Sequence, residues 1–253
     1  MRPTLALSLL GVAAGILSGI FGVGGGFIIV PGLVLFFNFK ASRAAGTSLA
    51  AVLPISLVSV LSYLLILHGN VDFMVALLVA AGGVFGSVIG VQAIRSVHNR
   101  RHVKLLSILL VGIGILMVFP VQPNTISLPA DAPALLLAGV LCGLLSGFFG
   151  IGGAVILLPL LTMMFGLPFQ KAAPIFLLAI VIISLASLRQ HLKMNHVDRC
   201  ALERIIPPAI AAALVTPYFS VQAPNALLHS SFGVLMLLYA VVLYLHARKL
   251  QKV

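Results

Sequence analysis

Charged residues are scarce in this chain of 253 residues: they make up 8% of it, whereas a soluble domain carries roughly 25%. Hydrophobic residues account for 61%, and the mean hydropathy is +1.23. The core of a soluble domain cannot bury this much apolar surface, so we expect most of the chain to lie in a lipid bilayer. Apolar runs recur from Leu5 to Leu245 without the alternating polarity of barrel strands, which predicts an all-α polytopic membrane protein.

Acidic side chains are almost missing. The chain has four of them, and each falls at the end of an apolar run: Asp72, Asp131, Asp198 and Glu203. Carboxylates within a membrane usually bind cations or relay protons. Because no apolar run contains one, a cation transporter of this composition would have to rely on backbone and hydroxyl oxygens. The inventory therefore suits an anion better than a cation.

Cysteine is also rare, and the two that occur, Cys142 and Cys200, lie at or near opposite ends of different apolar runs. Neither a disulfide nor a metal site is predicted from this spacing. The apolar runs hold no cluster of His, Glu and Cys, and neither Ser18 nor Ser146 has a histidine nearby within the membrane. We therefore expect no enzyme activity and no cofactor.

The net charge of +11 comes from basic residues in short loops between the apolar runs. Such loops are typical of the cytoplasmic side of a membrane protein, so nucleic acid is not an expected partner. Residues 1–20 have the look of a signal peptide, with Arg2 ahead of an apolar core. They lack a convincing cleavage site and have an internal copy, so we interpret them as part of the membrane domain.

Glycine, proline and charge clusters divide the chain into ten apolar segments. They span residues 4–20, 26–38, 44–67, 72–95, 102–119, 133–149, 153–166, 170–190, 200–219 and 228–247. A Pro-rich linker at 120–132 separates a first repeat at 1–119 from a second at 133–253, and together they form one transmembrane domain. The segments 26–38 and 153–166 reach only about 20 Å as helices, against a membrane core of roughly 30 Å. Each of these two segments either crosses the membrane or enters and leaves it on the same side, so the chain has roughly 8–10 membrane segments.

The second half of the chain repeats the first. Residues 15–36, GILSGIFGVGGGFIIVPGLVLF, align without gaps on residues 143–164, GLLSGFFGIGGAVILLPLLTMM, with 11 of 22 positions identical. Further along, NVDFMVALL at 70–78 resembles HVDRCALER at 196–204. Internal repeats of this kind are typical of transporters.

The basic residues predict how the two repeats are oriented. If the two segments that flank each glycine cluster form a hairpin, each repeat crosses an odd number of times and the second is inverted. Fourteen basic residues then face the side of the N-terminus, and only Lys171 faces the other. Parallel repeats would split them 7 to 8 at best. The excess of Lys and Arg on cytoplasmic loops therefore predicts inverted-topology repeats with both termini cytoplasmic.

Glycine clusters break each repeat directly ahead of its short segment. Glycine is costly inside a helix, but it permits positive φ and a close approach of the backbone to a ligand. The helix that follows each break begins with unpaired N–H groups and a partial positive charge. Two such N-termini that face each other from opposite sides predict a cradle for an anion. The alternative is that the glycines only allow close helix packing, which suits Gly15, Gly19, Gly143 and Gly147 well.

The pattern G-x-x-S-G-x-x-G-x-G-G-G with a later proline, duplicated 128 residues on, resembles the TauE/SafE family of sulfite exporters. The segments AAGTS at 44–48 and GNVD at 69–72 are similar to further motifs of that family, so the resemblance covers nearly the whole chain. It implies a permease for small anions such as sulfite, sulfate, sulfonates, sulfoacetate or carboxylates. Ala154 replaces the last glycine of the second motif, and AAPIF at 172–176 stands where a second GTS is expected. The two halves of the site are therefore not equivalent.

We expect a small anionic substrate to be held between the two breaks by alternating access, in a multi-pass protein of the bacterial inner membrane. The predicted substrate-binding residues are Ser18, Gly22, Gly24, Gly25, Gly26, Phe27, Thr47, Ser48, Ser146, Gly150, Gly152, Gly153 and Ala154. Simpler roles stay open for the hydroxyls, which can bond to their own helix or cap it. The alternative function is transport of a divalent metal or another cation, bound by backbone carbonyls. A homodimer is one possible oligomeric state.

Overall fold

A computed structural model describes residues 3–68, 71–94, 97, 99–119 and 132–249, and every regular element within these residues is a helix. The elements are α1 (Pro3–Phe21), α2 (Gly26–Phe37), α3 (Ala41–Ile66), α4 (Phe73–Ala93), α5 (Asn99–Val118), α6 (Ala132–Phe149), α7 (Ala154–Pro159), the π-helix η2 (Leu160–Met164), α8 (Phe169–Lys193), α9 (Arg199–Gln222) and α10 (Asn225–Lys249). Eight of the described helices are long and apolar enough to cross a membrane. The chain is therefore an all-α polytopic membrane protein, as its sequence predicts. The predicted linker lies outside the described residues apart from Ala132, which begins α6.

Two helices are short, as the sequence predicts. The 12 residues of α2 extend about 18 Å, well short of a membrane core of roughly 30 Å. The second short segment differs from the first, because α7 ends after 6 residues and continues as the 5-residue π-helix η2. Pro159 lies inside α7 and Pro31 occupies the equivalent place in α2, which stays α-helical. The proline alone therefore does not cause the π-turn.

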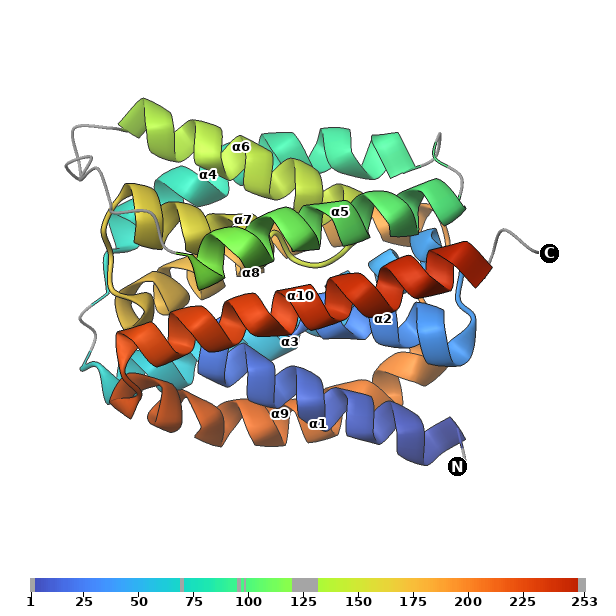
Figure 1. Cartoon of the computed structure of the whole chain (residues 1–253), viewed down its shortest axis with the longest axis horizontal. Coiled ribbons are helices and arrows are strands. Elements are labelled where there is room, and N and C mark those ends of the chain that lie inside the picture. The colour runs from blue at the N-terminus through green and yellow to red at the C-terminus, as the bar shows by residue number, and fades with distance from the viewer. Residues whose placement is uncertain (1–2, 69–70, 95–96, 98, 120–131, 250–253) are drawn as a thin grey trace.

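The helices of one half pack mainly on helices of the other. α1 lies along α9 and α4 lies along α6, while α5 packs on α10 and α3 packs on both α8 and α9 (Figure 1). Because α1 and α6 hold equivalent places in the sequence repeat, as do α9 and α4, the α1–α9 interface has a counterpart in α6–α4. In Figure 1, α1 runs from right to left and α6 from left to right, and α5 and α10 also run in opposite directions.

Glycine brings the helices of these two matched interfaces close together. A Cβ added to Gly15 of α1 would overlap the carbonyl oxygen of Ala209 in α9, and one added to Gly143 of α6 would overlap that of Gly83 in α4. Backbones in direct contact gain dispersion energy that larger side chains would prevent, which is how membrane helices associate. The sequence predicts a packing role for Gly15, Gly19, Gly143 and Gly147. The structure agrees, because each of these glycines faces the backbone or a side chain of the neighbouring helix.

We expect the Gly143→Ala substitution to lower the melting temperature, because α6 would have to move away from the carbonyl oxygen of Gly83. Such overpacking costs on the order of 1–3 kcal/mol. The matched control is Gly112→Ala in α5, where an added Cβ would meet nothing within 4 Å. Alanine favours a helix over glycine by up to about 1 kcal/mol, so this variant should melt at the same temperature or higher. Thermal unfolding in detergent compares the two, and equal melting temperatures would contradict the packing role.

Candidate functional site

Each glycine break is a reversal of the backbone that requires positive φ. The first has φ values of +67°, +67° and +74° at Gly22, Gly24 and Gly25, and the second has +71°, +82° and +70° at Gly150, Gly152 and Gly153. Residues other than glycine rarely adopt these angles. The equivalent glycines of the two breaks therefore share one conformation, as expected from their common sequence motif.

Serine carbonyls close the helices that lead into the breaks. The N–H of Gly22 donates to the carbonyl oxygen of Ser18 at 2.8 Å, and the N–H of Gly150 donates to that of Ser146 at 2.8 Å. The next helices begin without a capping side chain, because their N-cap residues are Gly25 and Gly153. No N-cap side chain therefore accepts from the first N–H groups of α2 and α7.

The two breaks meet although they are more than 100 residues apart in the sequence. A Cβ placed on Gly26 would lie 2.9 Å from the carbonyl carbon of Ile151, so the start of α2 touches the second break. Added Cβ atoms on Gly24 and on Gly152 would each come within 4 Å of the same two side chains, Val52 of α3 and Ile180 of α8. Each of these lies about 16 Å along its helix, near the middle of a span of 26 or 25 residues.

Protein covers both breaks completely. Every glycine of the two clusters is buried, and Phe27 and Ile151 are each 1% exposed. Phe27 packs its ring against Phe232 and Tyr239 of α10. Ala154 begins α7, directly after the second break. Irregular backbone at membrane depth is tolerated only where protein covers it or where it lines a cavity, and here protein covers it.

The four predicted hydroxyl side chains are all buried, and they have different surroundings. The Oγ atoms of Ser18 and Ser59 lie 2.8 Å apart, within hydrogen-bond distance. Ser48 Oγ donates to the carbonyl oxygen of Gly26 at 3.4 Å, which brings it to the start of α2. The Oγ of Ser146 has no hydrogen-bond partner among the described residues.

Thr47, the fourth of them, is engaged elsewhere. Its Oγ1 accepts from the N–H of Asp198 at 2.9 Å, directly ahead of α9. The structure therefore brings Ser48 to the first break, whereas the neighbouring Thr47 binds the α8–α9 connection.

Sequence reasoning missed Ser56 of α3. Its side chain is fully buried, its Oγ has no partner in the described part of the chain, and a Cβ on Gly24 would lie 2.6 Å from it. The equivalent Ser184 of α8 instead donates to the carbonyl oxygen of Val181 at 3.1 Å. A signal was present, because Ser56 and Ser59 recur as Ser184 and Ser187 at the same 128-residue offset as the glycine motif.

The charged side chains are held away from the breaks. Asp72 caps α4, and Asp198 caps α9 while accepting from Arg43 at 2.6 Å. Glu203 is exposed in the first turns of α9. The described surroundings of the breaks thus consist of backbone groups, serine hydroxyls and apolar side chains, and they include the carbonyl oxygens of Ala14, Cys142 and Ile151. Such a set can donate hydrogen bonds to a small ligand without a formal charge of its own.

We expect the Gly152→Ala substitution to be milder than Gly153→Ala. Both positions have positive φ, which costs an alanine about 1–2 kcal/mol. At Gly152 the nearest atom to an added Cβ is Ile180 Cγ1 at 3.4 Å, which is an ordinary contact. At Gly153 the added Cβ would overlap the Sγ atom of Cys142, so α6 must also shift. Melting temperatures in detergent test the order, and a larger loss for Gly152→Ala would contradict this geometry.

Comparison with known proteins identifies the family of this chain. Residues 1–117 and 135–253 match the family model described as sulfite exporter TauE/SafE. A probable membrane transporter protein of Methanocaldococcus jannaschii is 30% identical over 196 residues, which cover 75% of this chain and 72% of that protein. A probable membrane transporter protein of Xylella fastidiosa is 28% identical over 121 residues, or 47% of this chain and 46% of that protein. Because the family model matches nearly the whole chain, this protein belongs to the TauE/SafE family, whose members are membrane transporters and not enzymes.

Proposed function

We propose that this protein moves a small oxyanion, such as sulfite or a sulfonate, across the cell membrane by alternating access, with the anion held between the two glycine breaks. The observation that carries the proposal is the meeting of the two breaks halfway along α3 and α8, each followed at once by the start of a helix. The first N–H groups of a helix are unpaired and carry partial positive charge, so they suit an anion. The family description, sulfite exporter, supports the same class of substrate.

In this proposal, the backbone N–H groups at 24–27 and 152–155 donate to the oxygens of the anion. The hydroxyls of Ser18, Ser48, Ser56 and Ser146 supply further donors, and Gly22 and Gly150 turn the chain into the site. The buried surroundings strengthen each of these interactions. The desolvation of the anion opposes binding, so a net affinity requires that its oxygens be well matched by donors.

The direction of the backbone favours an anion over the alternative, a cation bound by carbonyl oxygens. The carbonyl oxygen of Gly25 accepts from the N–H groups of Ile28 and Ile29, and that of Gly153 accepts from the two equivalent N–H groups of α7, at Ile156 and Leu157. These carbonyls therefore point along their own helices, away from the breaks. The carbonyl oxygen of Gly26 accepts from Ser48 as well. A cation would have to compete with each of these bonds.

We further propose that the two repeats have inverted topology, as the repeats of many alternating-access transporters do. The opposite directions of α1 and α6 support it, as do those of α5 and α10 (Figure 1).

The hydrogen bonds that join helix ends support the orientation of the molecule. α8 begins beside the start of α10, because the Phe169 N–H donates to Asn225 Oδ1 at 2.8 Å. α8 therefore ends at the opposite side, where α9 begins and where Arg43 ties the start of α3 to Asp198. That side also holds Arg248 in the last turn of α10, whereas Lys171 lies at the start of α8. The positive-inside rule then assigns the side of Arg43 and Arg248 to the cytoplasm.

We expect the Ser56→Ala substitution to weaken sulfite binding about tenfold, the loss typical of one hydrogen bond to a charged group. Its melting temperature should stay the same or rise, because a buried hydroxyl without a partner is removed. The matched control is Ser184→Ala. The hydroxyl of Ser184 already donates to its own helix, so this variant should bind sulfite with the affinity of the wild type. Isothermal titration of the purified variants with sulfite, sulfate and isethionate is the measurement. A wild-type protein that binds none of these anions would contradict the proposed function.

We expect native Cys200, exposed near the start of α9, to resist a membrane-impermeant maleimide in intact cells and to react once the membrane is permeabilised. Cys142 is buried and serves as a silent background. The control is a Cys200→Ser, Gln222→Cys variant, which carries its thiol at the opposite end of α9 and should react in intact cells. The reverse pattern of labelling would overturn the orientation.

A further inference from the structure

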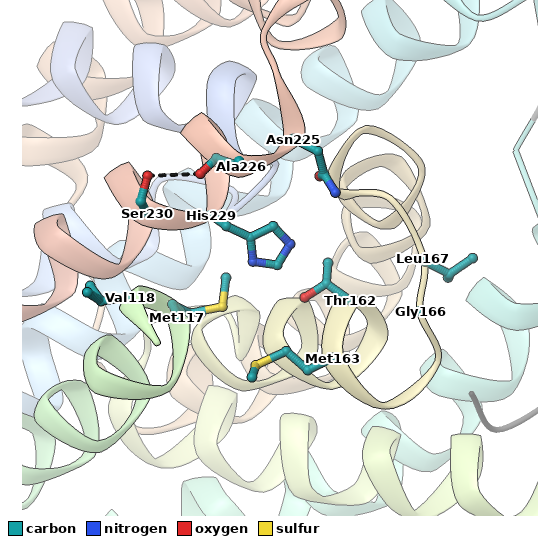
Figure 2. Close-up of a pocket in the computed structure, with 10 residues that line it drawn as sticks. All are labelled: Met117, Val118, Thr162, Met163, Gly166, Leu167, Asn225, Ala226, His229 and Ser230. Atoms are coloured by element: carbon teal, nitrogen blue, oxygen red, sulfur yellow. Dashed lines mark hydrogen bonds between the residues drawn. The ribbon is translucent and has the colours of Figure 1, made fainter. Parts of the chain in front are cut away.

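A cavity of about 650 Å³ lies where α5 ends and α10 begins, apart from the two glycine breaks. Thr162 and Met163 of η2 form one wall, Met117 of α5 forms another, and Asn225 and His229 of α10 face them (Figure 2). Asn225 is exposed at the rim, so the cavity communicates with the outside of the protein. The π-turn that distinguishes η2 from the equivalent part of α2 carries two of the lining residues.

The polar groups of this cavity suit an anion. Asn225 Oδ1 accepts from the N–H of Phe169, which leaves the amide NH₂ group as the donor of that side chain. The Nδ1 atom of His229 is buried without a partner within the described residues, and the ring lies inside the cavity (Figure 2). The hydroxyls of Thr162 and Ser230 donate to carbonyl oxygens of their own helices, and the rest of the described lining is apolar and holds no carboxylate. An oxyanion would therefore have the Asn225 amide and the His229 ring as its donors here.

Aromatic rings in mutual contact lead from the cavity to the residue ahead of the first glycine break. The ring of His229 contacts Phe169 edge-on, with centroids 5.5 Å apart, and Phe169 contacts Phe21 at 6.2 Å and Phe232 at 6.1 Å. Phe21 directly precedes Gly22 in the chain. Both Phe169 and Phe232 are fully buried, so these rings form a buried line of contacts from the cavity to the break.

The residues ahead of the second break pack against a buried histidine. His102, in the first turn of α5, is 1% exposed, and its Nε2 lies 2.8 Å from the carbonyl oxygen of Phe148. Its ring also packs on Phe149, which directly precedes Gly150. At the same end of the molecule, Arg43 and Thr47 tie α3 to Asp198. Contacts between aromatic rings thus join this cavity to the first break, whereas the residues ahead of the second break pack on a buried histidine.

We propose that this cavity is a vestibule of the transport pathway, in which the Asn225 amide and His229 bind a small oxyanion on its path between the outside and the first glycine break. Phe21, Phe169 and Phe232 are the gate that the anion must pass. This inference rests on the proposed function and adds a second binding site to it, on the side of the protein away from Arg248. Transport then requires the rings to turn aside while the contacts around His102 and Asp198 stay closed.

The test is Asn225→Asp, which changes the charge of the vestibule and preserves its structural hydrogen bond. A carboxylate oxygen can still accept from the N–H of Phe169, and an acidic residue at the start of a helix is favourable. The control is Gln222→Glu, which makes the same change of charge at the end of α9, outside the cavity lining. Uptake of sulfite into proteoliposomes is measured over a range of sulfite concentrations and ionic strengths.

At sulfite concentrations below saturation, we expect uptake by Asn225→Asp to fall about tenfold or more, and added salt to restore part of it by screening. Gln222→Glu should stay within about twofold of the wild type, because its charge lies outside the cavity lining and is screened by the solution. If the wild type transports sulfite and the two variants behave alike, the vestibule is overturned and the proposed function stands. If the wild type neither binds nor transports an oxyanion, both fall. Should Asn225→Asp fail to fold, Ser230→Asp places the charge at the exposed rim of the same lining and is read in the same way.

Discussion

The architecture depends on one constraint: backbone N–H and C=O groups at membrane depth need a hydrogen-bond partner or a cover of protein. Both glycine breaks interrupt their helices among apolar segments, where lipid can supply no partner. α3 and α8 solve this by crossing over the breaks, with Val52 and Ile180 against Gly24 and Gly152. The close glycine contacts of α1 with α9 and of α6 with α4 then hold the helices that lead into each break. The packing of the whole molecule therefore serves to cover two short stretches of irregular backbone.

The two halves share a backbone pattern and differ in the side chains that surround it. Ser18 pairs with Ser59, whereas the equivalent Ser146 has no partner among the described residues. The short helix α2 stays regular where α7 gives way to the π-turn of η2. π-turns within helices are frequent at functional sites, and this one lies at the cavity beside α10. A repeat thus supplies the symmetric backbone pattern, and a local departure from it, the π-turn, lines the cavity beside α10.

Electrostatics in this protein comes from dipoles more than from charges. The described carboxylates cap α4 and α9 or lie exposed, and the described basic side chains lie near helix ends. The centre is left with helix N-termini and hydroxyls, whose partial charges act strongly where water is excluded. An anion can be desolvated in such surroundings without meeting a fixed counter-charge that would hold it too tightly to release. This balance suits a transporter, which has to bind its substrate and then let it go.

The segment boundaries, the repeat and the positions of the breaks could be predicted from the sequence. Hydropathy, glycine clusters and the 128-residue offset can each be seen in the order of the residues alone. Roles that depend on neighbours distant in sequence could not. Thr47 and Ser48 are adjacent, but consecutive residues point about 100° apart around a helix, so Ser48 reaches Gly26 while Thr47 binds Asp198. Ser56 appears in the sequence as one polar residue within an apolar segment, and its place beside Gly24 follows from how α3 packs across the first break.

By itself, the sequence determined that the chain spans a membrane, where its helices break and that the breaks come as a pair. The first follows from the hydropathy of each segment, and the other two follow from the glycine clusters, where a helix is costly. Only the tertiary structure decided that the two breaks meet, that Cys142 lies over Gly153 and that a cavity is present beside η2. The reason is that each of these depends on the register in which helices from the two halves pack. That register is set by surface shape along whole helices, which a one-dimensional pattern does not contain.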